Sequence, residues 1–470
     1  MEAIHLLTLT TAFIIFAAIF RRRTSSHPGR NPTTIRISDA SIARVALIDH
    51  ADAFSNRPMP PFPTGRPITH SISSLPYGPR WRAVRSNLTT GILQRSRLGI
   101  LATLKREAAE TLVTNLSSHA GGDVVLRDFI HGAVFALVAR QCFGDGIDER
   151  DMSSMLQTQK DFLESSFTKV RPQEVSSWLT RILRSWRQSP RRDGIFDRVD
   201  QVFIPPVVAA RRRESQHGND GGFRSHLDSL LELQVPNEDH EHTLRQLRDE
   251  EVAFLCWEFL GGGTLSALTC LEWMIAHLAV EPEIQNKLNR EVADAQLKGT
   301  MAYDELTLPY LHAVVLESLR LHPPTPFAVR HMHIDDSIAA ALGKSSVIIP
   351  PGGAAVSFVL GDIGRDGKVW MNPDEFIPER FMEGGEGKGV SLVPGPNKEI
   401  KMMPFGGGRR RCPGVVMGMS HIKCFLAELV YAFQWMSPAD GGESDFVAVD
   451  GFRKMMKTPL RVRITPRSPT

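Results

Sequence analysis

The sequence predicts a mostly α-helical fold with small β-sheets, and three observations lead to this prediction. Apolar residues recur with helical spacing from Trp81 to about Ala209, and a long apolar stretch runs from Arg248 to Ala279. Segments with strand-like alternation, such as Thr34–Ser38, are short and scattered. Helical spacing buries one face of a helix, whereas alternation buries one face of a strand. With 470 residues, 42% of them hydrophobic, the chain can bury a large core around these helices.

The chain begins with an apolar segment. Residues Ala3–Phe20 are almost wholly apolar, and Arg21–Arg23 follow at once. This length is near the lower limit for crossing a bilayer. A cleaved signal peptide has its positive charge before the apolar segment; charge after it favours a retained anchor with the following chain in the cytosol. We therefore predict a membrane anchor over residues 1–23, a polar linker over residues 24–33 and one large domain over residues 34–470.

The elements of the large domain follow from local patterns. Alternation predicts a strand over Thr34–Ser38, and Asp39 or Ser41 can cap a helix that ends near Leu47. Residues Arg211–Gly222 are charged and glycine-rich, which predicts an exposed loop. Periodicity and glycine or proline boundaries predict the later elements: a helix over Tyr303–Leu321, strands over Ser346–Ile349 and Ala355–Leu360, a helix over Val415–Phe433 and an edge strand over Pro459–Thr465.

Charge and cysteine content exclude several classes of protein. Lys+Arg total 55 and Asp+Glu total 52, so the net charge of +3 gives no support for nucleic-acid binding. The 5 cysteines are scattered and none forms a C-x-x-C pair. This pattern argues against a zinc ribbon or a disulfide framework and favours a reducing compartment.

The long apolar helix contains three consecutive glycines, Gly261–Gly263. Each glycine costs about 1 kcal/mol in a helix interior. The run therefore predicts a local distortion or the close approach of a ligand, and packing against another helix is the alternative.

A loop near the C-terminus, Phe405–Gly414, contains the residues with the clearest chemistry. It places Cys412 in a glycine- and arginine-rich segment immediately before an apolar helix. Backbone N–H groups at a helix N-terminus stabilise a thiolate, which is a metal ligand. The glycines allow the backbone to approach a bulky planar ligand, and the arginines supply positive charge for its acidic groups.

Two further motifs combine charged or aromatic residues at helical spacing. Glu317 and Arg320 are three residues apart and can pair on one face of an apolar helix. A buried pair needs a further partner, and Arg380 is the candidate. Trp81 and Arg85 are four residues apart and share a helix face.

These motifs together resemble those of the cytochromes P450. F-x-x-G-x-R-x-C-x-G at Phe405–Gly414 resembles the haem-thiolate loop, and E-x-x-R at Glu317–Arg320 and P-E-R-F at Pro378–Phe381 precede it in the family's order. The resemblance runs from about Thr34 to the end of the chain. It is greatest to the plant A-type microsomal enzymes, in particular the cluster that includes chlorophyll-catabolite oxidisers and in-chain fatty-acid hydroxylases. It implies a cytochrome P450 fold preceded by one N-terminal transmembrane helix.

The resemblance also implies roles for the motif residues around haem b. Cys412 would be the metal ligand, in a loop bounded by Phe405 and Gly414. Glu317, Arg320 and Arg380 would be structural. Contacts to the haem propionates would come from residues in three separate motifs: Trp81, Arg85, His331 and Arg410.

The implied activity is insertion of one oxygen atom from O2 into an apolar small molecule, with electrons from NADPH through a cytochrome P450 reductase. The basic residues Lys398, Lys401, Arg409 and Arg411 would face that reductase. We expect a monomeric enzyme of plant secondary metabolism, anchored by a single pass in the endoplasmic reticulum membrane, with its catalytic domain in the cytosol.

The chain departs from the family pattern in the proton-relay segment of the long helix. The family's acid is Leu265 here, its threonine is Ser266, and the next hydroxyl residue is Ala267. We predict Ser266 and Thr264 as the catalytic hydroxyl residues. Two other functions stay open: a haem-thiolate isomerase or dehydratase acting on a hydroperoxide, and a degenerate haem-binding protein. The segment 24–33 is also shorter than the family's proline-rich hinge.

Overall fold

A computed structural model describes residues 34–58, 70–94, 98–167, 178–217, 224–238, 240, 242–299, 308–332, 354–396, 398–438, 446–449 and 453–467. The predicted anchor and linker, and the predicted strand at Ser346–Ile349, lie outside the described residues.

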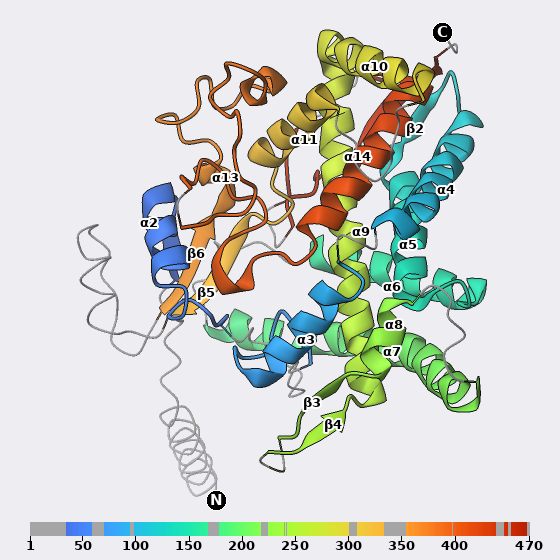
Figure 1. Ribbon diagram of the computed structural model, residues 1–470, viewed down its shortest axis with the longest axis vertical. Helices are drawn as coiled ribbons and strands as arrows, with labels where there is room; N and C mark the ends of the chain where they lie inside the picture. Colours follow the sequence, from blue (N-terminus) through green and yellow to red (C-terminus); the bar gives the residue numbers. More distant parts are fainter. Residues whose placement is uncertain are drawn as a thin grey trace, which may run out of the picture.

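The described part is mostly helical, as predicted (Figure 1). Its α-helices are α2 (Ala40–Arg44), α3 (Pro79–Thr90), α4 (Leu98–Ser117), α5 (Leu126–Phe143), α6 (Glu149–Phe167), α7 (Trp178–His217), α8 (His226–Leu231), α9 (Asp249–Val280), α10 (Pro282–Leu297), α11 (Pro309–Leu321), α13 (Leu360–Ile363) and α14 (Val415–Ala432). A π-helical turn, η1 (Val45–Asp49), and two 3₁₀ turns, η3 (Pro378–Phe381) and η4 (Gly408–Arg410), complete the helical elements.

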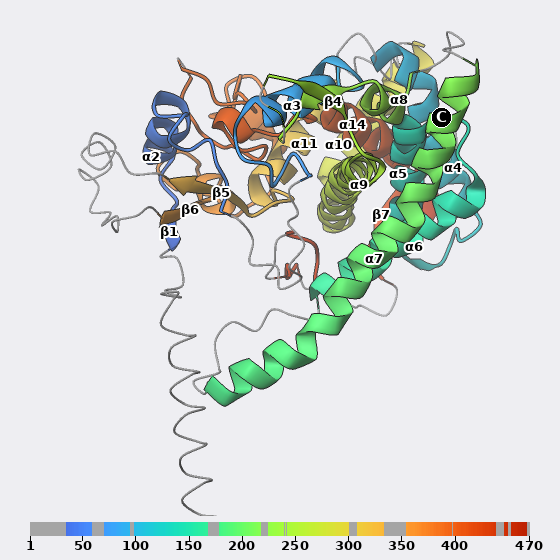
Figure 2. The same cartoon turned by 90° about the horizontal axis from the view of Figure 1, so that it is seen from below.

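Helix α9 is the central element of the core. It runs through the middle of the helical part, with α14 and α5 beside it (Figure 1), and most of its side chains are buried. Among the described residues, α9 and α14 are long and apolar enough to cross a membrane, but 61% of the most apolar window of each is buried inside the protein. Both are therefore core helices in this structure. Helix α7 packs on α9 at one end and extends outward at the other (Figure 2).

The strands form three small sheets. The first contains β1 (Thr34–Ile37), β6 (Ala354–Val359) and β5 (Phe327–Met332), with β6 in the middle, parallel to β1 and antiparallel to β5. The second contains β2 (Asp123–Val125), β8 (Arg461–Pro466) and β7 (Phe433–Met436), and the third pairs β3 (Gln234–Pro236) with β4 (Leu244–Gln246). The β1–β6–β5 sheet and α2 lie together at one side of the helical part (Figure 1).

Most of the predicted elements are confirmed within a few residues. Asp39 caps α2 by accepting hydrogen bonds from the backbone N–H groups of Ser41 and Ile42. Two predictions were wrong. Arg211–His217 is the last part of α7 rather than a loop, and β8 is the middle strand of its sheet rather than an edge strand. Tertiary pairing on both sides of β8 is invisible in a local alternation pattern.

The three glycines do not distort α9, which is α-helical from Asp249 to Val280. A Cβ atom on Gly263 would lie 2.9 Å from Val138 Cγ1 on α5, so this glycine permits close packing of two helices. Gly261 and Gly262 differ, because a Cβ atom on either would meet nothing within 4 Å. The packing alternative therefore holds for one glycine, and the other two border open space.

Candidate functional site

The cysteine loop has a conformation that requires glycine. Gly406 and Gly408 have φ angles of 68° and 69°, which glycine adopts freely and most other residues avoid. A Cβ atom on Gly408 would also lie 2.7 Å from the carbonyl oxygen of Leu47. The Cys412 N–H donates to the carbonyl of Phe405 at 2.9 Å and closes the loop. The thiol is thereby held two residues before Gly414, the N-cap of α14.

The electrostatic environment of Cys412 has two opposing parts. Burial raises the pKa of the Cys412 thiol, whereas the Gly414 N–H and the charges of Arg85 and Arg57 lower it. Burial has the largest effect, so the thiol is neutral in the protein alone. The Gly414 N–H and the two arginines favour negative charge on sulfur once a metal ion binds it.

Arg410 and Trp81 are fixed by one polypeptide segment. The Arg410 guanidinium donates to the carbonyls of Ser55, Ile72 and Leu75 at 2.7, 2.9 and 2.6 Å. It lies over the Trp81 ring, 4.7 Å from the centroid, and the Trp81 indole N–H donates to the same Ile72 carbonyl. The predicted residues Trp81 and Arg410 are therefore in direct contact.

Arg85 joins this group from α3. Its Nη2 donates to the carbonyl of Arg411 at 2.7 Å, and its guanidinium lies 5.8 Å from the Trp81 ring centroid. Burial lowers the pKa of Arg85 to about 10. Burial also lowers the pKa of Arg57, a residue that the sequence motifs did not indicate.

The strand β5 separates Arg330 from His331. Arg330 is 1% exposed, its Nη2 donates to the Gly407 carbonyl at 3.0 Å, and burial lowers its pKa to about 9. His331 is half-buried and pairs through its backbone with Asn56. Successive residues of a strand point to opposite faces, so it is Arg330 that faces the cysteine loop. His331 therefore points to the opposite face of β5, away from the cysteine loop, and this placement does not support its predicted contact with a propionate.

We call Arg57, Arg85, Arg330 and Arg410 the arginine cluster. Burial is the main cause that lowers the pKa values of all four arginines, and repulsion adds to it in three: Arg57 acts on the other three, and Arg410 also acts on Arg330. Glu258 on α9 is the one described carboxylate that raises the pKa values of Arg57, Arg85 and Arg410. Its carboxylate accepts hydrogen bonds from the N–H groups of Ile72 and Ser73 and from the Ser73 hydroxyl. The cluster thus carries excess positive charge beside Cys412.

Haem b, the cofactor that the motifs imply, fits these residues. Its two propionates carry the negative charge that the arginine cluster lacks, and Arg330 Nε is buried with no partner among the described residues. A thiol that can become a thiolate lies next to the cluster, and a Cβ atom on Gly414, two residues after it, would meet nothing within 4 Å. The residues present therefore match both the acidic edge and the metal of haem.

The predicted catalytic hydroxyl residues lie on different sides of α9. Ser266 is half-buried, and its Oγ accepts a hydrogen bond from Arg453 Nη1 at 3.2 Å. Thr264 is fully buried, and its Oγ1 has no hydrogen-bond partner among the described residues. This placement does not support the predicted role of Thr264. Leu265 and Ala267, which replace polar residues of the family pattern, are both buried in the core.

The predicted structural group forms as expected. Arg320 binds both Glu317 oxygens at 2.7 and 2.8 Å, and Arg380 Nε donates to Glu317 Oε1 at 3.2 Å. All three side chains are at most 3% exposed. The remaining donors of Arg320 go to the carbonyls of Gly364, Pro373 and Glu375. This group holds the segment from Gly364 to Ile377 that leads into η3, and we call it the Glu317 network.

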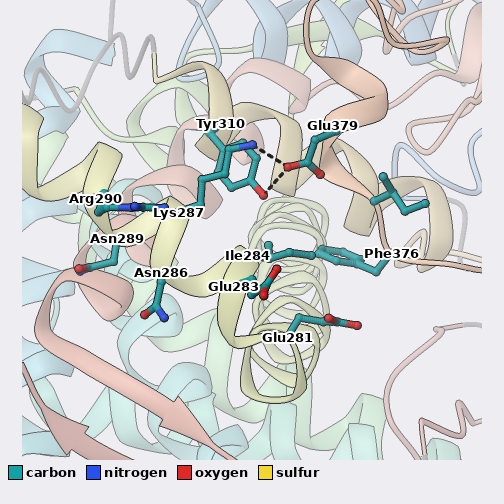
Figure 3. Close-up of a pocket in the computed structure, with 11 residues that line it drawn as sticks. Glu281, Glu283, Ile284, Asn286, Lys287, Asn289, Arg290, Tyr310, Phe376 and Glu379 are labelled. Carbon is teal, nitrogen blue, oxygen red and sulfur yellow. Dashed lines mark hydrogen bonds and ion pairs between the residues drawn. The ribbon is translucent and has the colours of Figure 1, made fainter.

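A separate cavity of about 830 Å³ lies where α10 and α11 meet η3 (Figure 3). Glu379 accepts hydrogen bonds from the Tyr310 hydroxyl at 3.0 Å and from Lys287 Nζ at 2.7 Å, as Figure 3 shows. No predicted site residue lines it, and these polar groups satisfy one another. It is distinct from the region around Cys412.

Comparisons with known proteins agree with this geometry. The family model described as "Cytochrome P450" matches residues 24–460. The chain is 33% identical to "Cytochrome P450 89A9" of Arabidopsis thaliana over 457 residues, which cover 94% of this chain and 86% of that protein. It is 27% identical to "Oryzalexin E synthase" of Oryza sativa subsp. japonica, with 91% of this chain and 82% of that protein covered.

Solved structures show the same fold. A zebra fish cytochrome P450 solved with progesterone has a TM-score of 0.72 at 20% identity, covering 92% of this chain and 93% of that chain. The same type of structure with abiraterone has a TM-score of 0.70. Family model, relative and fold agree, so this chain belongs to the cytochrome P450 family, whose members are oxidoreductases that use haem b, O2 and electrons from a reductase.

Proposed function

We propose that this protein is a haem-thiolate monooxygenase that inserts one oxygen atom from O2 into an apolar small molecule. The observation that carries the proposal is the position of Cys412 beside the arginine cluster. Haem with a thiolate ligand supplies the chemistry of O2 activation. The protein provides the ligand, the counter-charge and the substrate site.

In this proposal each group of residues has one task. Cys412 binds the metal, and the Gly414 N–H and Arg85 stabilise negative charge on its sulfur. Arg330, Arg85 and Arg410 bind the propionates, with Trp81 packed against two of these guanidinium groups. Arg330 takes the place that we first gave to His331. Ser266 holds a water molecule that passes protons at its Oγ.

The proposal extends to partners and location. Arg411 and Lys398 are exposed, whereas Arg409 pairs with Asp52 at 2.9 Å and Lys401 donates to the Glu386 carbonyl at 2.6 Å. This basic surface suits an acidic NADPH-dependent reductase. Residues 1–23 would hold the protein in the endoplasmic reticulum membrane by a single pass, with residues 34–470 in the cytosol. The protein would act as a monomer in plant secondary metabolism.

The carbon-monoxide difference spectrum of the reduced protein tests the ligand. The wild type should show the band of a thiolate-ligated haem, and Cys412→Ala should abolish it. Cys424→Ala, which removes another thiol just beyond the loop, is the control and should keep the band. A wild type with no such band, or Cys412→Ala with an unchanged band, would contradict the proposal.

A second function is favoured by one observation. Leu265 and Ala267 are buried in apolar surroundings, so α9 supplies no acid beside Ser266 among the described residues. An isomerase or dehydratase acting on a hydroperoxide needs no proton relay. Consumption of NADPH with formation of a hydroxylated product favours the monooxygenase, and turnover of a hydroperoxide without NADPH favours this alternative. Haem binding with neither activity identifies a degenerate haem binder.

A further inference from the structure

Arg453 reaches the central helix from the C-terminal part of the chain. It lies shortly before β8, and its guanidinium makes two hydrogen bonds with α9. Nη1 donates to Ser266 Oγ at 3.2 Å, and Nη2 donates to the Gly261 carbonyl at 3.1 Å. No sequence motif indicated this residue, because it is far from α9 in the chain.

The charge of Arg453 has no acidic partner among the described residues. Burial alone lowers the pKa of Arg453, to about 10. Two arginines that are more deeply buried have acidic partners: Arg127 binds Glu272 at 2.9 Å, and Arg320 binds Glu317. A guanidinium has five N–H donors, and the described contacts of Arg453 use two of them. Arg453 is half-buried. A partly desolvated cation whose described contacts are a hydroxyl and a carbonyl can still gain from an anionic partner.

The helix face beside Arg453 borders open space. Gly262 is exposed although it lies in the middle of a core helix, and Ser266, one turn later on the same face, is half-buried. Glu258, one turn earlier on this face, interacts with Arg57, which also interacts with Cys412. The open face of α9 therefore begins on the side of the cysteine loop and ends at Arg453.

We propose that Arg453 binds a carboxylate of the substrate, so that the substrate is an amphipathic carboxylic acid with an apolar body. This inference rests on the proposed function and narrows its substrate class. A guanidinium matches a carboxylate with two parallel hydrogen bonds. The apolar body then lies along the open face at Gly261 and Gly262, where no side chain intervenes.

Arg453 cannot replace the family's acid, because a guanidinium does not release its proton in proteins. Its hydrogen bond fixes the Ser266 hydroxyl. A purely structural Arg453 would do the same, so the test must separate binding of an anion from support of α9.

The test uses the haem-loaded full chain and pairs of ligands that differ in charge alone. A series of saturated fatty acids, from decanoate to octadecanoate, is compared with the corresponding primary amides. The readout is the change in haem absorption on ligand binding, which needs no reductase and no turnover. At least one acid should bind about tenfold or more tightly than its amide, which corresponds to ~1.4 kcal/mol.

Three variants identify the residue responsible. Arg453→Gln should remove the preference for the acid while leaving amide binding unchanged, and Arg453→Lys should retain part of it. Arg463→Gln, which changes an exposed arginine of β8, is the matched control and should behave as the wild type. Equal binding of acid and amide by the wild type, binding of neither, or an acid preference that survives in Arg453→Gln would overturn the inference.

The carbon-monoxide difference spectrum distinguishes failure of the carboxylate-binding inference from failure of the proposed function. A thiolate band together with no acid preference rejects the carboxylate site alone. Absence of the thiolate band in the wild type rejects the proposed function itself. An unchanged thiolate band in Arg453→Gln shows that the variant is folded and loaded with haem.

Discussion

Two groups of buried arginines in this chain have opposite electrostatic environments. In the Glu317 network, Arg320 and Arg380 share a carboxylate, and Arg380 also binds Glu386 at 2.6 Å. In the arginine cluster, guanidinium groups donate to backbone carbonyls, and their charges lower one another's pKa values. The first group is complete in the protein alone. The second lacks negative charge, which is the basis for proposing it as the site of an anionic ligand.

The comparison also distinguishes arginines that come from the same set of sequence motifs. Arg320, Arg380 and Arg410 all belong to the motifs that resemble those of the cytochromes P450. Only the positions of the carboxylates show that the first two have an acidic partner and that Arg410 donates to backbone carbonyls instead. Removal of one partner from a buried ion pair is strongly destabilising, because the other charge is left buried and uncompensated.

The largest expected effect is loss of stability when the Glu317 network is broken. Glu317→Gln leaves Arg320 and Arg380 buried without their shared carboxylate. We expect the free energy of unfolding to fall by about 3–5 kcal/mol, because an uncompensated buried charge remains. Urea unfolding of the haem-loaded chain, followed by circular dichroism, measures this change. Glu383→Gln, at an exposed carboxylate, should change the stability little. Equal losses in the two variants would contradict the stabilising role of the Glu317 network.

A smaller effect of different kind is expected in the arginine cluster. Arg330→Met removes a buried charge that has no acidic partner among the described residues. In the haem-free protein, this substitution should therefore lower the free energy of unfolding much less than Arg380→Met does. Haem release should become about tenfold faster or more, because a charged hydrogen bond is worth roughly 1.5–3 kcal/mol. Transfer of haem to a scavenging globin measures the release rate. Unchanged release in Arg330→Met would show that this arginine does not bind a propionate.

Buried histidines provide a third case, in which a base avoids an unpaired charge by staying neutral. His277 Nε2 lies 2.9 Å from His322 Nε2, and His322 stacks on Trp273. Burial lowers the pKa of His277 to about 3 and that of His322 well below its usual value. Folding therefore requires both rings to be neutral, whereas each gains a proton below about pH 6.5 in the unfolded chain.

The resulting pH dependence is the third expected effect, and it develops gradually as the pH falls. The contribution of His277 to stability is complete above about pH 6.5 and falls as the pH decreases toward 3. At pH 5 the loss should be about 2 kcal/mol, from 1.36 kcal/mol per pH unit. His277→Gln should make unfolding less sensitive to acid over this range, as measured by thermal melts from pH 7 to 5. His119→Gln, at an exposed histidine, should leave the wild-type slope, and the same slope in both variants would contradict the argument.

Much of the fold and the main features of the site could be predicted from the sequence. Length and apolar content indicated α9 and α14, most of whose side chains are buried. The loop around Cys412 could be recognised because it combines glycine, arginine and cysteine immediately before an apolar helix. Glu317 and Arg320 are close in the chain, so their pairing follows from helix geometry. Arg57, Arg330 and Arg453 could not be predicted, since no local pattern distinguishes a buried arginine from an exposed one.

The sequence by itself determined the mostly helical class, the position of the thiolate loop and the local pairs of charged residues, because these depend on interactions within a few turns of chain. Only the tertiary structure decided which arginines lack carboxylates, that β5 turns Arg330 rather than His331 toward the loop, and that Arg453 meets Ser266. These facts depend on contacts between distant segments, where burial and charge compensation are set by the packing of the whole domain.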